Sequence, residues 1–131
     1  MNVVNVSNFF PPETFGLQLG ADKTVQIPLN DLFSTNVVPA SGNLSASFLT
    51  YDYGVVAAGV SSPASVTLTI QPYLDDNYLI PAQTAATFTG TSGAVQTAAA
   101  PIFRSVTVTV SNAGTSAVDL TNLFVVVRST T

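Results

Sequence analysis

The feature that most constrains this fold is the strict alternation of apolar and hydroxyl side chains at residues 105–111. The segment reads Ser-Val-Thr-Val-Thr-Val-Ser, so its valines and its hydroxyl residues fall on opposite sides of an extended chain. A period of two residues is typical of a β-strand with one face in a core and the other in solvent. Segments 65–71 and 24–29 repeat the pattern. The inward residues predicted for them are Val66, Leu68, Ile70, Val25, Ile27 and Leu29.

Two further segments have apolar residues on both faces. In residues 44–53, Leu44, Ala46 and Phe48 share one face, and the other face carries Leu49, Tyr51 and Tyr53. In residues 118–128 the apolar residues change from even to odd positions near residues 121–122, which predicts a β-bulge there. We expect this last strand to be central in its sheet, whereas Pro28 places the 24–29 strand at an edge, because proline lacks a ladder donor.

Short strands separated by turn residues describe an all-β fold, an antiparallel β-sandwich or jelly roll. Helix is expected for at most one turn, near residues 29–33. Residues 81–101 form an Ala, Thr, Ser and Gly tract with one strand-like piece at residues 87–89. Connections of this length are uncommon unless they are functional or mobile, so we interpret this tract as a long surface loop that orders on contact.

No boundary divides the chain, so we expect a single domain over residues 16–131 with residues 1–15 as an N-terminal arm or first strand. The candidate interface residues in this arm are Phe9, Phe10, Pro11, Pro12 and Phe15. The proline pair holds the chain extended, so the rings must find an apolar surface elsewhere. That surface belongs either to the domain itself or to an adjacent subunit.

The chain lacks the side chains that most enzymes use. It has no Cys, His or Trp, a single Lys (Lys23) and a single Glu (Glu13). General bases, thiol nucleophiles and zinc ligands are drawn mainly from the missing set. We therefore predict that the protein is not an enzyme and that it uses no cofactor.

Charge is scarce, and this bears on partners. Charged residues make up 8% of the chain and the net charge is −4, against about 25% charged residues in an average domain. Nucleic-acid binding needs clustered cations, which are absent from this sequence. No apolar run is long enough for a membrane span, and the first residues do not resemble a secretory signal. Subunit interfaces lose charges at their centres, so this composition favours assembly into a homo-oligomer or a larger structure.

The sequence Asp75-Asp76-Asn77 is the main cluster of polar chemistry. Aspartate and asparagine are turn formers, so the simplest interpretation is a hairpin tip. The alternative is a calcium site, since carboxylates are hard oxygen ligands, but the spacing is not that of an EF-hand. An acidic pair of the glycosidase type is a third, remote alternative. Our prediction for catalytic and metal sites is therefore none.

The sequence leaves open the role of the four tyrosines and the surroundings of Arg104. Tyr51, Tyr53, Tyr73 and Tyr78 either pack at strand ends or form a platform that stacks on sugars. Arg104 either lies in solvent at the end of the sheet or pairs with an aspartate across an interface. We favour packing for the tyrosines and solvent for Arg104.

Residues 66–128 resemble small β-sandwich proteins of bacteriophage particles. The resemblance lies in the strand at Val66, the acidic turn at residues 71–78, the strand at residues 103–110 and the Asn112-Ala113-Gly114 turn. It implies a virion structural protein, such as a minor capsid, decoration or cementing protein, with other virion proteins and its own copies as partners. The expected location is then the virion. The alternative is a carbohydrate-binding or adhesin-like module, which would be extracellular or at the cell surface.

Overall fold

The computed structural model describes residues 2–5, 24–49, 53–97 and 104–129. These residues form an all-β structure with one turn of helix. The elements in chain order are β1 (Asn2–Asn5), β2 (Thr24–Pro28), α2 (Leu29–Leu32), β3 (Val37–Val38), β4 (Gly42–Leu49), β5 (Tyr53–Tyr73), β6 (Ala86–Gln96), β7 (Ser105–Asn112), β8 (Val118–Asp119) and β9 (Asn122–Ser129).

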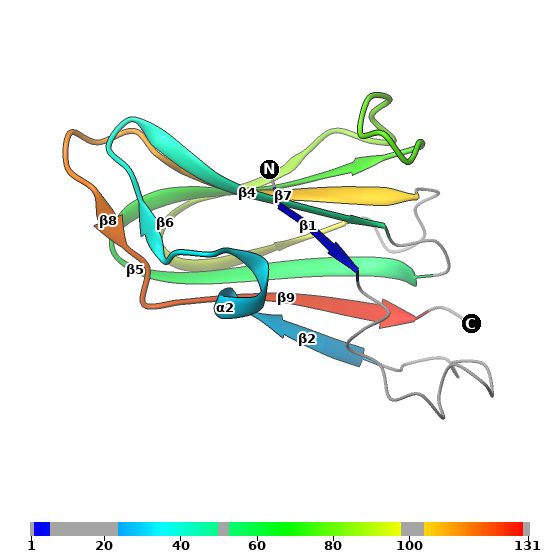
Figure 1. The fold of residues 1–131 in the computed structure, drawn as a ribbon, viewed down its shortest axis with the longest axis horizontal. Coiled ribbons are helices and arrows are strands. Elements are labelled where there is room, and N and C mark those ends of the chain that lie inside the picture. The colour runs from blue at the N-terminus through cyan, green and yellow to red at the C-terminus, as the bar shows by residue number, and fades with distance from the viewer. Residues whose placement is uncertain (1, 6–23, 50–52, 98–103, 130–131) are drawn as a thin grey trace.

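The strands form a sandwich whose two layers share a pair of long strands. One layer contains β1, β4 and β7, and the other contains β9 and β2 (Figure 1). The pairings are antiparallel except for β1, which runs parallel to β4. This confirms the predicted fold class and the edge position of the strand with Pro28, because β2 ends the order of the strands that the structure describes.

Strand β5 passes from one layer to the other. Its first part, up to Ser61, pairs with β9, and its last part, from Thr67, pairs with β7. Strand β6 follows β5 through both layers, and the register between them shifts between Ser61 and Val66. A bulge of this kind bends a strand and increases its twist. The buried Ser62 holds the corner, because its hydroxyl donates to the carbonyl of Ala64 at 2.6 Å.

The core lies between the layers and follows the predicted alternation. Val106, Val108 and Val110 of β7 are fully buried, whereas Thr107 and Thr109 are partly exposed on the outer face. The other predicted inward residues whose burial the structure describes are also in the core: Leu29, Val66, Leu68 and Ile70. On β4, Ala46 and Phe48 are in the core and Leu44 packs against it. Burying a large apolar side chain contributes about 1.5–3 kcal/mol, so this face supplies much of the folding free energy.

Three predictions about strands were wrong. Residues 44–53 are not one strand, because β4 ends at Leu49 and Tyr53 belongs to β5. Residues 81–101 do not form a long surface connection, because β6 occupies eleven of them, from Ala86 to Gln96. The strand-like piece expected at residues 87–89 lies within this strand and is confirmed. The expected single strand over residues 118–128 is two strands in different sheets: β8 pairs with β3, and β9 lies between β5 and β2. The change of phase near residues 121–122 therefore marks the passage between sheets. The central position holds for β9 alone.

The helical turn lies where it was expected. Residues 29–32 form α2, and the amide of Phe33 donates to the carbonyl of Leu29 at 3.0 Å. Leu32 and Phe33 are buried and close the core beside β2. None of the helices in the described ranges has the length and apolarity that crossing a membrane requires.

Candidate functional site

Among the residues whose burial the structure describes, the most exposed large apolar side chains lie on the loop between β5 and β6. Leu79 is 74% exposed, Ile80 is 55% exposed and Leu74 is 44% exposed. We call this set the apolar tip. Isolated exposed apolar residues are ordinary, but a group of three on one short loop is typical of a contact surface. Figure 1 shows the loop, in green, at the end of the molecule opposite β8.

The apolar tip is held in place by the carboxylate of Asp75. Its oxygens accept hydrogen bonds from the amides of Asn77 (3.1 Å), Leu79 (3.0 Å) and Ile80 (2.8 Å). These donors, that of Ile80 first, hold the pKa of the Asp75 carboxyl below its ordinary value of 3.8. The loop is closed by the amide of Leu74, which donates to the carbonyl of Ile80 at 2.8 Å. The backbone beneath the exposed side chains therefore has a defined shape.

A second set of bonds joins the loop to the start of β7. The guanidinium of Arg104 donates from Nε to Asp76 Oδ1 at 2.7 Å and from Nη2 to Oδ2 at 3.2 Å. This side-chain hydrogen bond lowers the pKa of the Asp76 carboxyl. The hydroxyl of Ser105 donates to the carbonyl of Asp75 at 2.6 Å. Arg104 is exposed, as expected, with 52% of its side chain accessible. It also pairs with an aspartate of its own chain, a partner that neither alternative named.

These contacts also bear on the calcium alternative. The carboxylates of Asp75 and Asp76 both face N–H donors, and the amide of Asn77 points at Asp75. A cation site presents oxygen atoms to a common centre, which is a different arrangement. Within the described ranges there is no group of three or more His, Cys, Asp or Glu that could hold a metal ion. The hairpin-tip interpretation fits the geometry of this segment.

The positions of the tyrosine rings bear on the alternative of a sugar-stacking platform. The rings of Tyr73 and Tyr78 meet edge to face, with centroids 6.0 Å apart and planes at 88°. Two perpendicular rings do not make the flat platform on which a sugar stacks. Tyr78 also adopts a positive φ of 60°, which turns the chain from the acidic turn toward Leu79. Tyr51 and the side chain of Tyr53 lie outside the described residues.

The remaining candidates are distributed as follows. Phe9, Phe10, Pro11, Pro12 and Phe15, the interface candidates of the N-terminal arm, lie outside the described residues, as do Glu13 and Asp52. Asp119 lies on β8 at the end away from the tip, and it accepts a hydrogen bond from the side-chain amide of Asn36. The structure therefore does not bring Asp119 together with Asp75 or Asp76.

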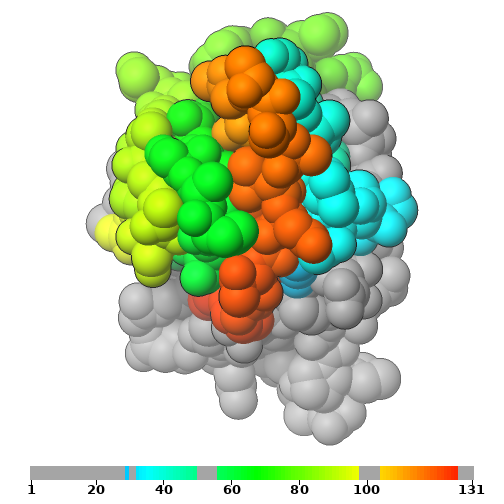
Figure 2. Space-filling model, turned by 90° about the vertical axis from the view of Figure 1, so that its left-hand side faces the viewer, coloured from blue at the N-terminus to red at the C-terminus, as the bar shows by residue number. Residues whose placement is uncertain are grey.

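A neutral hollow lies at the end of the sandwich away from the tip. In Figure 2, which faces this end, the orange segment after β7 lies between the green corner of β5 and the cyan segment that leads into β4. The hollow has a volume of about 440 Å³ and no charged residue among its lining. Asn112 shapes it, because its side-chain amide donates to the carbonyl of Ser116 at 2.8 Å and its oxygen accepts the amide of Gly114 at 2.9 Å.

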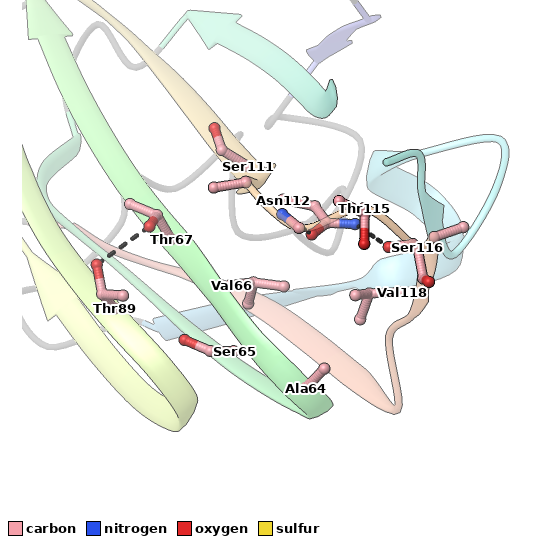
Figure 3. A pocket seen from close by; sticks show the side chains of 13 residues that line it. Ala64, Ser65, Val66, Thr67, Thr89, Ser111, Asn112, Thr115, Ser116 and Val118 are labelled. Atoms are coloured by element: carbon pink, nitrogen blue, oxygen red, sulfur yellow. Dashed lines mark hydrogen bonds between the residues drawn. The ribbon is translucent and has the colours of Figure 1, made fainter. Parts of the chain in front are cut away.

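Hydroxyl groups form one wall of this hollow. Thr67 and Thr89 are paired across β5 and β6 at 3.1 Å, and Ser111 lies on the neighbouring strand (Figure 3). The same pairing continues along the outer face of this layer, where Ser45 bonds Thr109 at 3.1 Å and Ser47 bonds Thr107 at 2.6 Å. On this face Ser45, Thr107 and Thr109 are partly exposed, whereas Ser47 is fully buried.

Sequence reasoning missed the apolar tip. The run Tyr78-Leu79-Ile80 follows the acidic turn and comes directly before Pro81. Apolar residues next to turn formers are as typical of a strand as of an exposed loop. Only the bonds from Asp75, which hold Leu79 and Ile80 at the surface, distinguish the two.

No protein-family model and no curated protein matches the chain. Solved structures do show similarity. A periplasmic inhibitor of g-type lysozyme from Aeromonas hydrophila aligns over 97% of this chain and 95% of its own, with 12% identity and a TM-score of 0.49. The Yersinia pseudotuberculosis-derived mitogen aligns over 82% and 86%, with 9% identity and a TM-score of 0.45.

A third solved structure, FlhE, aligns over 86% of this chain and 100% of its own, with 12% identity and a TM-score of 0.48. The descriptions of these three proteins name an inhibitor, a mitogen and FlhE, and none names a virion protein. At these identities and scores, the similarity carries no argument about what this protein binds.

Proposed function

We propose that this chain is a non-enzymatic structural protein that contacts its neighbours in an assembly through the apolar tip. The setting that the resemblance implies is a virion, in which the protein would be a minor capsid, decoration or cementing protein. The observation that carries the proposal is the exposure of Leu79 and Ile80 on a loop fixed by Asp75. The tip then docks on an apolar site of an adjacent virion protein.

The way in which the tip is held supports a binding role. A loop that must be ordered on contact loses affinity, because ordering costs conformational entropy. Here three amides of the loop are already bonded to Asp75, and Arg104 ties the turn to β7. Large apolar anchors at the centre of an interface supply most of the binding free energy. Leu79 and Ile80 are suited to this role.

The aspartates support the same proposal. Asp75 and Asp76 bond amides and a guanidinium within the loop, and Asp119 bonds Asn36. A general acid at neutral pH needs a raised pKa, and the pKa values of Asp75 and Asp76 are lowered. These three aspartates act as structural groups.

The test is incorporation into particles. Wild-type chain and the double variant Leu79→Ser/Ile80→Ser are supplied during particle assembly, and the amount of chain per purified particle is measured. We expect wild-type chain in the particles and at least a tenfold loss for the double variant, which corresponds to about 1.4 kcal/mol. The matched control is Val37→Ser, an exposed apolar residue on β3 at 38% exposure, which should leave incorporation unchanged. Particles without wild-type chain would overturn the proposal.

A second candidate function is binding of a neutral carbohydrate in the hollow beside Asn112. It is favoured by the hydroxyl wall of Thr67, Thr89 and Ser111 and by the absence of charge in the lining. Sugar hydroxyls exchange hydrogen bonds with such groups. A glycan array separates the two functions: binding that Ser111→Ala and Thr67→Val weaken would support this alternative, and a blank array would exclude it.

A further inference from the structure

We propose that the outer edge of β6 is a self-association surface, at which residues Ser92–Gln96 pair with the same residues of a second copy in an antiparallel arrangement. This dimer is separate from the contact proposed for the apolar tip and does not depend on it.

The edge of β6 is unusual among the sheet edges of this chain. Among the described residues β6 has one strand neighbour, β5, which it follows over its whole length. Along an edge strand, every second residue presents unpaired N–H and C=O groups that can pair with another chain. The other two edges of this seven-stranded sheet are short: β1 has four residues, and β2 has five and ends in Pro28. The strands of the small second sheet, β3 and β8, have two residues each. β6 has eleven residues, against a mean strand length of about 5–6.

Natural proteins block long edges with charges or proline, and β6 has neither. Its sequence is Ala-Thr-Phe-Thr-Gly-Thr-Ser-Gly-Ala-Val-Gln. No Asp, Glu, Lys, Arg or His occurs between Asp76 and Arg104. The one disturbance is the bend opposite the β5 corner, where Gly90 has a φ of 156°. Beyond the bend, Ser92–Gln96 pairs with residues 57–61 of β5 without a shift in register.

Charge and symmetry indicate that the partner at the edge of β6 is a second copy of the same chain. Two copies that each carry a net charge of −4 repel one another at most orientations. At this edge they meet without like charges, because the strand and both flanking segments are uncharged. An antiparallel pair around a two-fold axis uses the same N–H and C=O groups from both partners, so the edge is complementary to itself.

The surface next to this segment adds apolar area. A shallow hollow of about 340 Å³ lies on the outer face of the β9–β5–β6 layer. Gly59 and Ala94 are cross-strand partners, Gly59 also pairs with Phe124, and the half-buried Phe124 lines the hollow. A second copy at the β6 edge extends this face and covers the exposed Ala94. That is why we place the pairing at Ser92–Gln96 and not at Ala86–Gly90.

The chain has no cysteine, so single-cysteine variants test the pairing directly. The exposed positions Ser92, Ala94 and Gln96 are each changed to Cys, alone and in pairwise mixtures, and oxidised. Residues that face each other in an antiparallel pair have Cα atoms about 4.5–5.5 Å apart, which is within disulfide range. In this register Ala94 faces its own copy and Ser92 faces Gln96, so we expect strong cross-linking for Ala94→Cys alone and for the mixture of Ser92→Cys with Gln96→Cys. The other variants and mixtures should cross-link weakly. The control is Thr115→Cys, on the exposed segment after β7, which should give background.

A charge variant gives an independent readout. Light scattering during chromatography over a dilution series should show a concentration-dependent dimer for the wild type. Ala94→Lys should shift it to monomer, because the lysines of the two copies meet near the axis. The charge-matched control Thr115→Lys and the tip variant Leu79→Ser/Ile80→Ser should both remain dimeric. A wild type that stays monomeric at high concentration, or background cross-linking at Ser92, Ala94 and Gln96, would overturn the proposal.

Discussion

Asp75 Oδ1 accepts the amide of Ile80 at 2.8 Å, so the residue that begins the acidic turn holds the backbone of an exposed apolar residue five positions later. The same carboxylate bonds Leu79. An exposed loop without such bonds would sample many conformations. The carboxylate therefore explains how the tip keeps one shape without being buried.

Removing this carboxylate should loosen the tip and leave the sandwich intact. For Asp75→Ala we expect hydrogen exchange at the amides of Asn77, Leu79 and Ile80 to speed up by roughly an order of magnitude or more. The amides of Val106 and Val108 in β7 should not change. Asp75→Asn retains an acceptor oxygen and should restore part of the protection. Equal exchange in the wild type and Asp75→Ala would show that the carboxylate does not order the loop.

Acid should weaken the tip in a defined direction. The folded pKa of Asp75 lies below its ordinary value of 3.8. A lowered pKa contributes stability above the unfolded pKa, and this contribution is lost as the pH falls through the folded pKa. The melting temperature of the wild type should therefore exceed that of Asp75→Asn at neutral pH. The difference should shrink below about pH 4. A difference that does not change with pH would contradict this assignment.

The ring of Phe88 lies over two glycines of its own strand. A Cβ atom at Gly90 would stand 2.8 Å from Cζ of Phe88, and one at Gly93 would come closer still to the ring. Gly93→Ala should lower the free energy of unfolding by about 1–3 kcal/mol, because the ring must move. Gly59→Ala is the matched control, since its nearest atoms are at 3.7 and 3.9 Å. Urea denaturation measures both variants, and the Gly93→Ala effect should shrink in a Phe88→Leu background.

The faces of β7 can be distinguished by exchanging their residue types. Val108→Thr places a hydroxyl in the core and should cost about 1–3 kcal/mol of stability. Thr109→Val, on the outer face, removes only the hydroxyl pair with Ser45 and should cost less than about 1 kcal/mol. Both are measured by denaturant unfolding. Equal effects would mean that the two faces of this strand are not differently buried.

The apolar alternation predicted the core well, because it is a local property of the extended chain. Val106, Val108 and Val110 are buried as their spacing indicates, and so are Val66, Leu68 and Ile70. The helical turn at Leu29 was also predictable, since it needs only a few neighbouring residues. The same local pattern predicted hydroxyls on the outer face.

The alternation of apolar and polar side chains did not predict the full length of β6, because the alternation is weak in this segment. Only Val95 of this strand is buried, and Ala86 and Phe88 pack partly against the core. Two glycines interrupt the alternation where the ring of Phe88 fills the space. The segment is a strand because β5 offers it hydrogen-bonding groups along its whole length. That partner lies across a turn, so no local pattern reveals it.

By itself, the sequence determined which side chains face inward and that catalysis would have few suitable groups. Only the tertiary structure decided that β5 crosses between layers, that β6 has a free edge among the described residues and that Leu79 and Ile80 stand exposed. The physical reason is the distance along the chain over which each effect acts. Side-chain alternation follows from the geometry of each extended residue, whereas backbone N–H and C=O groups must be satisfied by partners that only the complete fold brings near.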